Sequence, residues 1–311
     1  DAEWIAELLQ HGVLRGSFIP SAAQRAVREL TRYRATLVAE RVRHVERLHK
    51  VLEGTNIKLA AVATDLVGVS GRRILQALLA GVTDPGQLAE LAKGRLRAKR
   101  AELEQALRGR IQVHQAFLIA ELLEHVDHLD EAIARVSQEV AERLRPFDED
   151  IARLDTIPGI NRRVAEDILA EIGTDMSRFA SARHLASWAG MCPGNNESGG
   201  KRKSGQTRHG SPWLRKALIE AAHAAARCKH GYLTAQYHRL AARRGKKKAV
   251  VAVGHTLLVI VSHVLMRHEE YHELGGNYFD ERDKQAVTRR LVQRLEKLGY
   301  EVSLQPTSIA A

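Results

Sequence analysis

Two long runs of helical periodicity constrain the fold of this chain more than any other feature. One extends from Ser21 to Glu53 and the other from about Gly109 to Leu144. Apolar residues of the second run are spaced 4, 3, 4, 3 and 4 apart, close to a heptad: Leu122, Val126, Leu129, Ile133, Val136 and Val140. Between the runs, residues 54–94 contain only short helical patterns separated by Gly and "TDPG". The sequence therefore predicts a long antiparallel coiled-coil hairpin, which Pro146 ends.

The rest of the chain is predicted to be mostly α as well. A helical domain begins near Asp148, and no segment shows the alternation typical of strands. Residues 249–266, "AVVAVGHTLLVIVSHVLM", nearly reach the length of a membrane span. Because His255, Ser262 and His263 interrupt that stretch, we interpret it as a buried core helix and expect no membrane partner.

The charge balance points to a polyanionic partner. The 311 residues carry a formal charge of +11. Between Glu197 and Val250 there are 14 cations and two acids, so that the remainder of the chain is close to neutral. We therefore place a nucleic-acid surface in the second half. Aromatic residues make up only 5% of the chain, which disfavours single-strand binding by base stacking.

Cysteine usage bears on the compartment. Two cysteines, Cys192 and Cys228, are too few for a disulfide framework. No signal-like apolar run precedes the first helix, and we expect a cytoplasmic protein.

Residues 154–173, "LDTIPGINRRVAEDILAEIG", are typical of a helix-hairpin-helix motif. Pro158 and Gly159 would form the turn, and backbone N–H groups at the next helix would hold a phosphate together with Arg162 and Arg163. Asn161 replaces the second glycine usual in this motif, and Asn tolerates positive φ. The alternative is an ordinary turn between two helices with solvated arginines.

The segment "NNESGGKRKSGQTRHGSPWLRKA", residues 195–217, is either a basic linker or a loop that brings a hydroxyl to a phosphate. Gly199 and Gly200 would let a ligand approach the backbone, and a serine hydroxyl of the loop would be the nucleophile. Clustered cations would stabilise its alkoxide and the phosphorane. Pro212 suits the start of the next helix. The predicted nucleic-acid contacts here are Lys201, Arg202, Lys203, Arg208 and Arg215.

Two further patterns have alternative interpretations. The cations Lys246, Lys247 and Lys248 of "RRGKKKAVVAV" form either a solvated helix start or a sequence-independent phosphate contact, which we favour. "HEEYH", His268 to His272, matches the H-E-x-x-H zinc pattern. It lies near a helix end without an obvious third ligand, which disfavours a metallopeptidase.

Taken together, these blocks resemble transposases of the insertion sequence 110 family. The resemblance rests on "LDTIPGIN", "SARHLASWAGMCPGNNESGGKRKSGQTRHGSPWLRKALIEAA" and "RGKKKAVVAVGHTLL" in that order, and it is strongest over 151–265. It implies a DNA recombinase with an α/β RuvC-like domain, a coiled-coil region that mediates dimerisation, and a carboxy-terminal domain whose serine attacks DNA. It also implies double-stranded DNA, a guide (bridge) RNA and a dimer or tetramer as partners.

By this resemblance Ser198 matches the nucleophile, and Asp1 matches the last acid of an Asp-Glu-Asp-Asp set that binds Mg²⁺. The other three acids would lie upstream, so we expect an amino-terminally truncated chain, with the RuvC-like domain largely missing and strand cleavage absent. The expected regions are a RuvC-like remnant (1–20), the coiled-coil region (21–147), the transposase domain (148–274) and a tail (275–311). The alternative is a non-catalytic helix-hairpin-helix DNA-binding protein.

Overall fold

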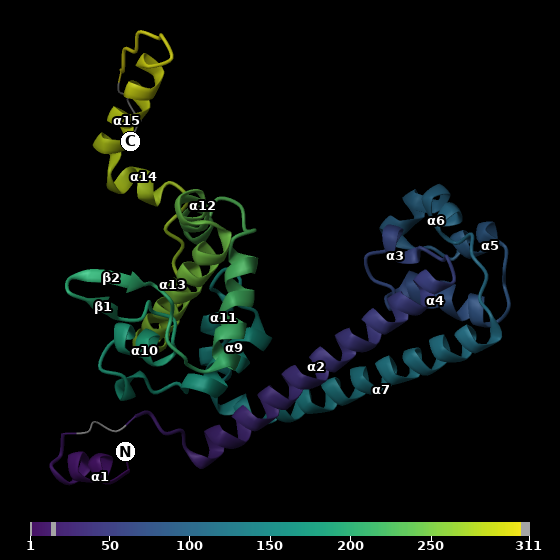
Figure 1. The fold of residues 1–311 in the computed structure, drawn as a ribbon, viewed down its shortest axis with the longest axis horizontal. Helices are drawn as coiled ribbons and strands as arrows, with labels where there is room; N and C mark the ends of the chain where they lie inside the picture. Colours follow the sequence, from purple (N-terminus) through teal and green to yellow (C-terminus); the bar gives the residue numbers. More distant parts are fainter. Residues whose placement is uncertain (1, 14–16, 306–311) are drawn as a thin grey trace. The chain divides into compact units, whose positions relative to one another are not determined.

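The fold is mostly α, as the sequence predicts (Figure 1). The structure is a computed structural model that describes residues 2–13 and 17–305. The chain divides into two compact units. Unit 1 comprises Asp1–Arg28 and Leu144–Ala311, and unit 2 comprises Glu29–Arg143.

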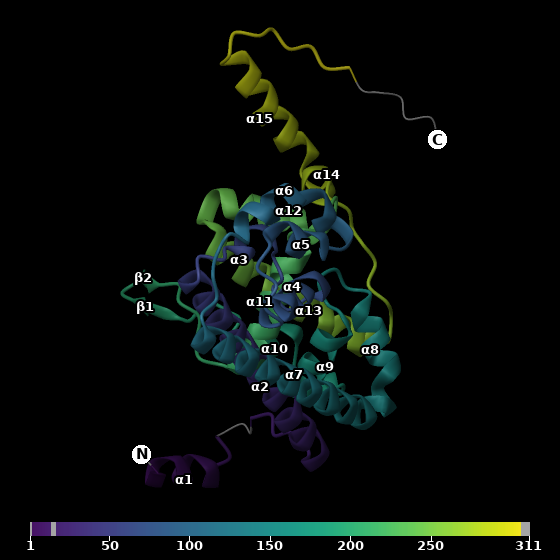
Figure 2. The same ribbon diagram turned by 90° about the vertical axis from the view of Figure 1, so that its right-hand side faces the viewer.

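Two long helices run side by side, α2 (Ala22–Gly54) and α7 (Val113–Leu144), and their residues 29–54 and 113–143 belong to unit 2 (Figures 1 and 2). Their polar contacts include Arg41, whose Nε donates to Asp130 Oδ1 at 2.5 Å. The rings of His44 and His125 stack with centroids 5.0 Å apart. The pairing of the two predicted long helices is thus present, whereas a coiled-coil twist stays a prediction.

Residues 55–112, here called the cap, connect α2 to α7 within unit 2. The cap contains five short helices: α3 (Leu59–Val62), α4 (Val69–Leu79), α5 (Pro85–Glu90), η1 (Gly94–Lys99) and α6 (Arg100–Ala106). Leu66, Ile74 and Leu103 of the cap are fully buried in one cluster with Leu48 of α2 and Ile119 of α7. Burial of such side chains contributes about 1.5–3 kcal/mol each. The cap is therefore a packed part of unit 2.

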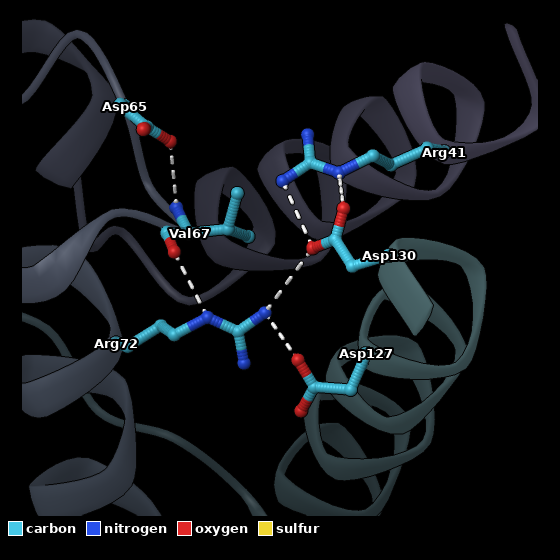
Figure 3. A network of polar contacts seen from close by, with 6 residues as sticks. All are labelled: Arg41, Asp65, Val67, Arg72, Asp127 and Asp130. Carbon is cyan, nitrogen blue, oxygen red and sulfur yellow. Dashed lines mark hydrogen bonds and ion pairs between the residues drawn. The ribbon is translucent and has the colours of Figure 1, made fainter. Parts of the chain in front are cut away.

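A network of charged side chains also fixes the cap to the helical pair (Figure 3). Arg72 of α4 pairs with Asp127 and lies 3.8 Å from Asp130, both on α7. Its Nε donates to the carbonyl of Val67 at 2.9 Å. Asp130 in turn binds Arg41 of α2, so that one carboxylate connects α2, α4 and α7.

Unit 1 is built around α13 (Lys246–Arg267). Its helices and 3-10 turns are α1 (Ala2–Gln10), η2 (Arg145–Phe147), α8 (Asp148–Asp155), α9 (Arg162–Ile172), η3 (Met176–Arg178), α10 (Ala182–Trp188), α11 (Pro212–Ala225), α12 (Tyr232–Arg244), α14 (Tyr278–Arg282) and α15 (Lys284–Glu296). Within the described part of the chain, α13 alone is long and apolar enough to cross a membrane. It packs against α8, α10, α11 and α12, which fits a core helix.

The carboxylate of Glu171 joins three helix ends in unit 1. Glu171 lies at the end of α9 and is only 2% exposed. Its Oε2 accepts from Ser211 Oγ at 3.0 Å and lies 3.5 Å from Nε of Arg28, in the first turns of α2. Arg28 also donates to the carbonyls of Ala170 and Glu171. Ser211 is the N-cap of α11, so this buried carboxylate sets where α11 begins.

Replacing Glu171 with Ala is expected to destabilise unit 1 by about 3 kcal/mol, because Arg28 and Ser211 would both lose this buried carboxylate partner. The measurement is urea denaturation followed by tryptophan fluorescence, since Trp4, Trp188 and Trp213 all lie in unit 1. Glu220→Ala is the control, because Glu220 makes an exposed 3.8 Å pair with Lys216. That variant should change stability by less than about 0.5 kcal/mol. Equal stability of the two variants would contradict the role of Glu171.

Candidate functional site

The predicted loop after α10 contains a two-stranded hairpin, which corrects the expectation of no strands. Strand β1 (Asn196–Ser198) pairs antiparallel with β2 (Lys201–Ser204), and Ser198 is opposite Lys201 (Figure 1). Gly199 and Gly200 form the turn with φ of +58° and +71°. Two consecutive positive φ values favour Gly-Gly between hairpin strands. The glycines are thus explained by the turn, and this dipeptide is the signal that could have predicted the hairpin.

The base of the hairpin is held by close backbone contact. A Cβ on Gly210 would lie 2.2 Å from the carbonyl oxygen of Ala189, and one on Gly190 would lie 2.7 Å from that of Arg208. No side chain fits at such distances, so both positions require glycine. The N–H of Gly194 donates to the carbonyl of Gln206 at 2.7 Å. The two ends of the loop are therefore fixed against each other.

Arg215 of α11 strengthens this base. Its Nη1 donates to the carbonyl of Gly190 at 3.1 Å and to Thr207 Oγ1 at 2.9 Å. The side chain is partly buried, which places it as a brace between α11 and the loop. Its predicted contact with nucleic acid would compete with these two bonds.

The three serines of residues 195–217 differ in their hydrogen bonding. Ser211 Oγ is bound to Glu171 and caps α11, and Ser204 Oγ accepts from the N–H of Gln206 at 3.1 Å. Ser198 is exposed next to the turn, and within the described residues its hydroxyl has no hydrogen-bond partner. Ser198 is thus the hydroxyl that is available to a ligand.

Most of the predicted phosphate contacts around this hydroxyl are exposed. Lys201, Lys203 and Arg208 have no carboxylate partner in the part of the chain that the structure describes. The side chain of Arg202 lies outside that part, as does the whole of Asp1. The hairpin therefore presents cations next to Ser198, as an attacked phosphate would require.

The lysines Lys246, Lys247 and Lys248 form the first turn of α13, and all three are exposed. Gly245 precedes them without a side-chain cap. Cations at the positive end of a helix dipole are unfavourable by about 0.3–1 kcal/mol each. An anion bound at this turn would remove that cost.

The segment predicted as a helix-hairpin-helix motif consists of α8, a turn and α9. Gly159 has φ of +91°, and a Cβ there would lie 2.3 Å from the carbonyl oxygen of Ala221 in α11. Its glycine is therefore needed for packing against α11. Arg162 pairs with Asp148 at 2.6 Å and Glu166 at 3.3 Å, and Arg163 also interacts within the chain. A phosphate would have to compete with these partners, and the motif stays a prediction.

The H-E-x-x-H match does not form a helical metal site. Helix α13 ends at Arg267, and His268 adopts a left-handed conformation with φ of +56°. The two histidines therefore do not share a helical face. Among the described residues, no group of three or more His, Cys, Asp or Glu side chains could hold a metal ion.

A second nucleophile candidate lies at the hairpin base, which the sequence did not single out. Cys192 Sγ is 3.7 Å from Nδ1 of His255. Burial raises the pKa of the Cys192 thiol and lowers the pKa of the His255 imidazole. Both shifts favour the neutral pair over a reactive thiolate and imidazolium. Ser198, which is exposed and has cations next to it, therefore stays the candidate nucleophile.

Comparisons with known proteins show which families the sequence is similar to. Residues 151–238 match the family model of the transposase IS116/IS110/IS902 family, and residues 1–57 match a second transposase model, the DEDD transposase of IS110. Both segments are therefore similar to transposase domains of the IS110/IS116 family.

The relatives that the sequence matches are described as a transposase and as gene-inverting proteins. A probable family 20 transposase of Pseudomonas aeruginosa is 28% identical over 73% of this chain and 59% of its own length. A pilin gene-inverting protein of Moraxella bovis is 26% identical over 48% of each chain. One of Moraxella lacunata is 31% identical over 38% of this chain and 37% of its own. The chain thus spans between about a third and three fifths of the relatives it matches.

Replacing Arg215 with Gln should open the base of the hairpin, because it removes charge-assisted bonds that contribute about 1.5 kcal/mol or more. We expect the amide of Gly194 to exchange hydrogen about tenfold faster, as measured by NMR. Lys216→Gln removes the same charge from the same helix but breaks only an exposed pair. It should leave exchange at Gly194 unchanged, and equal acceleration in both variants would refute the bracing role.

Proposed function

We propose that this chain is part of a DNA transposase or recombinase in which Ser198 attacks the DNA backbone. The observation that carries the proposal is the exposed hydroxyl of Ser198 beside a braced turn with clustered cations, while Ser204 and Ser211 are engaged in hydrogen bonds. The transposase match over residues 151–238 supports it. The relatives described as pilin gene-inverting proteins support a rearrangement of DNA.

The proposed step is a transesterification. The oxygen of Ser198 forms a bond to phosphorus as its proton leaves, and one ester bond between that phosphorus and a neighbouring sugar oxygen breaks. The departing oxygen takes up a proton, giving a free sugar hydroxyl and a phosphoserine link. The number of phosphodiester bonds is conserved, so a second sugar hydroxyl can reverse the step and rejoin a different strand.

The residues of this chain would supply charge and position. The phosphorane carries an additional negative charge, and cations held in place beforehand stabilise it more than mobile ones do. Lys201 faces Ser198 across the turn, with Lys203 on the same strand. The braced base reduces the motion of the turn relative to α11, which keeps these groups near the attacked phosphate.

The proposal includes a divalent metal ion, but it gives that ion no role in a particular step. The DEDD transposase match over residues 1–57 supports a need for divalent ions, and we propose Mg²⁺ with Asp1 as a ligand. Asp1 is outside the described residues, and those that are described do not form a fitting ligand set. We therefore assign no step to the metal.

The remaining partners are also part of the proposal. They are double-stranded DNA, a guide RNA and a dimer or tetramer of this chain, in a cytoplasmic setting. DNA binding is supported by the transposase matches and by the exposed cations of the hairpin and of α13.

The test of Ser198 uses DNA with a bridging phosphorothiolate at the scissile position. A thiolate leaves without help from an acid or a metal, so adduct formation reports the nucleophile alone. With this activated substrate, unlike with unmodified DNA, we expect the 311-residue chain to form a denaturant-resistant adduct with one bridging polarity. Ser198→Ala should reduce the yield at least a hundredfold, and Ser204→Ala should react like the original chain. An undiminished adduct with Ser198→Ala, or no adduct with the original chain, would refute the proposal.

The contact between α13 and phosphates predicts a strong dependence of DNA affinity on salt. If six or more cations contact phosphates, affinity should fall about a thousandfold between roughly 50 and 200 mM salt. Replacing Lys246, Lys247 and Lys248 with Gln should reduce the slope of log K against log salt by about 2–3. Lys284→Gln, Arg289→Gln and Arg294→Gln on α15 together remove the same charge. An equal change in this control would mean that only net charge matters.

A further inference from the structure

A second cationic surface lies on the cap, outside both matched transposase segments. Residues 93–100 read "KGRLRAKR", with no acid among them. They include η1, a tight helical turn (Gly94–Lys99). Five cations in eight residues repel one another, and the short backbone segment keeps them close together. The cations are Lys93, Arg95, Arg97, Lys99 and Arg100.

These cations differ from other cations of unit 2 in their pairing. Arg41 and Arg72 are neutralised by Asp127 and Asp130 (Figure 3). Of the five, Arg100 pairs with Glu90 at 3.0 Å. The side chains of the other four are exposed and have no carboxylate partner among residues 2–13 and 17–305. Their charge is therefore available to an external anion.

A surface cavity of about 600 Å³ adjoins this run. Lys93, Arg95 and Lys99 line it together with Ser70 and the start of α4, and Asp65 is the one acid in the lining. Asp65 Oδ1 already accepts from the N–H of Val67 at 3.1 Å. The cavity thus combines a net positive lining with the positive end of an 11-residue helix.

The walls of this cavity are held in place. The N–H of Lys93 donates to Ser70 Oγ at 2.9 Å, which connects the cationic run to α4. Arg72, two residues after Ser70 on α4, is fixed to α7. A rigid cationic surface loses less entropy on binding than a mobile tail.

The chemistry of the lining identifies the kind of ligand. It contains no aromatic side chain, so bases cannot stack there as they do on single-strand binding proteins. Arginine and lysine side chains next to a hydroxyl and a helix N-terminus can bind phosphate oxygens. Contacts with phosphates are independent of the base sequence. The spread of cations beyond the cavity favours a repeating anion over one small molecule.

We propose that the cap binds the sugar-phosphate backbone of double-stranded DNA through Lys93, Arg95, Arg97 and Lys99, independently of sequence. This contact goes beyond the proposed function, since it requires neither Ser198 nor the cations of unit 1. It would give the chain a second DNA contact, in unit 2.

The test measures affinity for a 30-bp DNA duplex by fluorescence anisotropy over a range of salt concentrations, with the full 311-residue chain. Arg95→Gln, Arg97→Gln and Lys99→Gln together should weaken binding at least tenfold at low salt and reduce the salt slope by about 2–3. Replacing the two arginines with lysines (Arg95→Lys, Arg97→Lys), which leaves Lys99 unchanged, should keep the slope. This second variant separates loss of charge from damage to the cap.

A matched control removes three exposed cations from α2 of the same unit: Arg43→Gln, Arg47→Gln and Lys50→Gln. We expect a smaller change in slope than for the cap variant. An equal change in both, or no change in the cap variant, would overturn the proposal. A duplex RNA of equal length gives a further arm. If the cap variant binds both duplexes more weakly than the original chain does, the result supports backbone binding. Weaker binding to the RNA duplex alone would overturn the assignment to DNA.

Discussion

The buried carboxylate of Glu171 is the interaction on which the position of the candidate site depends. It binds Arg28 at the start of α2 and Ser211 at the start of α11, while it sits at the end of α9. A buried charge is tolerated only when its partners are in place, so the three helix ends are fixed together. Because α11 must begin at Ser211, the segment before it has a defined end. The close contact of Gly190 with Gly210 then closes that segment into a hairpin.

The hairpin combines a rigid base with an exposed turn, and each half needs glycine for a different reason. At the base, Gly190 and Gly210 let two backbone segments touch. At the turn, Gly199 and Gly200 have positive φ and open space around them. A nucleophile on an exposed turn with a rigid base can reach a phosphate of the DNA backbone while it stays in a fixed position relative to the supporting helix. This arrangement explains why the hydroxyl of Ser198 has no partner among the described residues, whereas that of Ser211, thirteen positions later, binds Glu171 and caps α11.

Helical periodicity predicted the long helices because each buries one continuous face, as Leu48 and Val126 show. The strands β1, which contains Ser198, and β2 escaped prediction because three or four polar or charged residues carry no apolar alternation. The pair of Arg162 with Asp148 and the packing of Gly159 against Ala221 join residues that are not neighbours in sequence, which no local pattern reveals. The end of α13 before His268 likewise depends on one left-handed residue. The family resemblance singled out Ser198 as the candidate, and the fold shows that its hydroxyl, unlike those of Ser204 and Ser211, has no hydrogen-bond partner among the described residues.

The sum of charges along the sequence placed the predicted polyanion-binding surface in residues 197–250, because the rest of the chain is close to neutral. Unit 2 shows why that sum is incomplete. Its acids include Asp127 and Asp130, which Arg41 and Arg72 neutralise, so they do not compensate the run at residues 93–99. Electrostatic attraction to DNA falls off within about 10 Å at moderate salt. A phosphate therefore responds to the unpaired cations nearest to it, and a unit with little net charge can still bind a polyanion at one end.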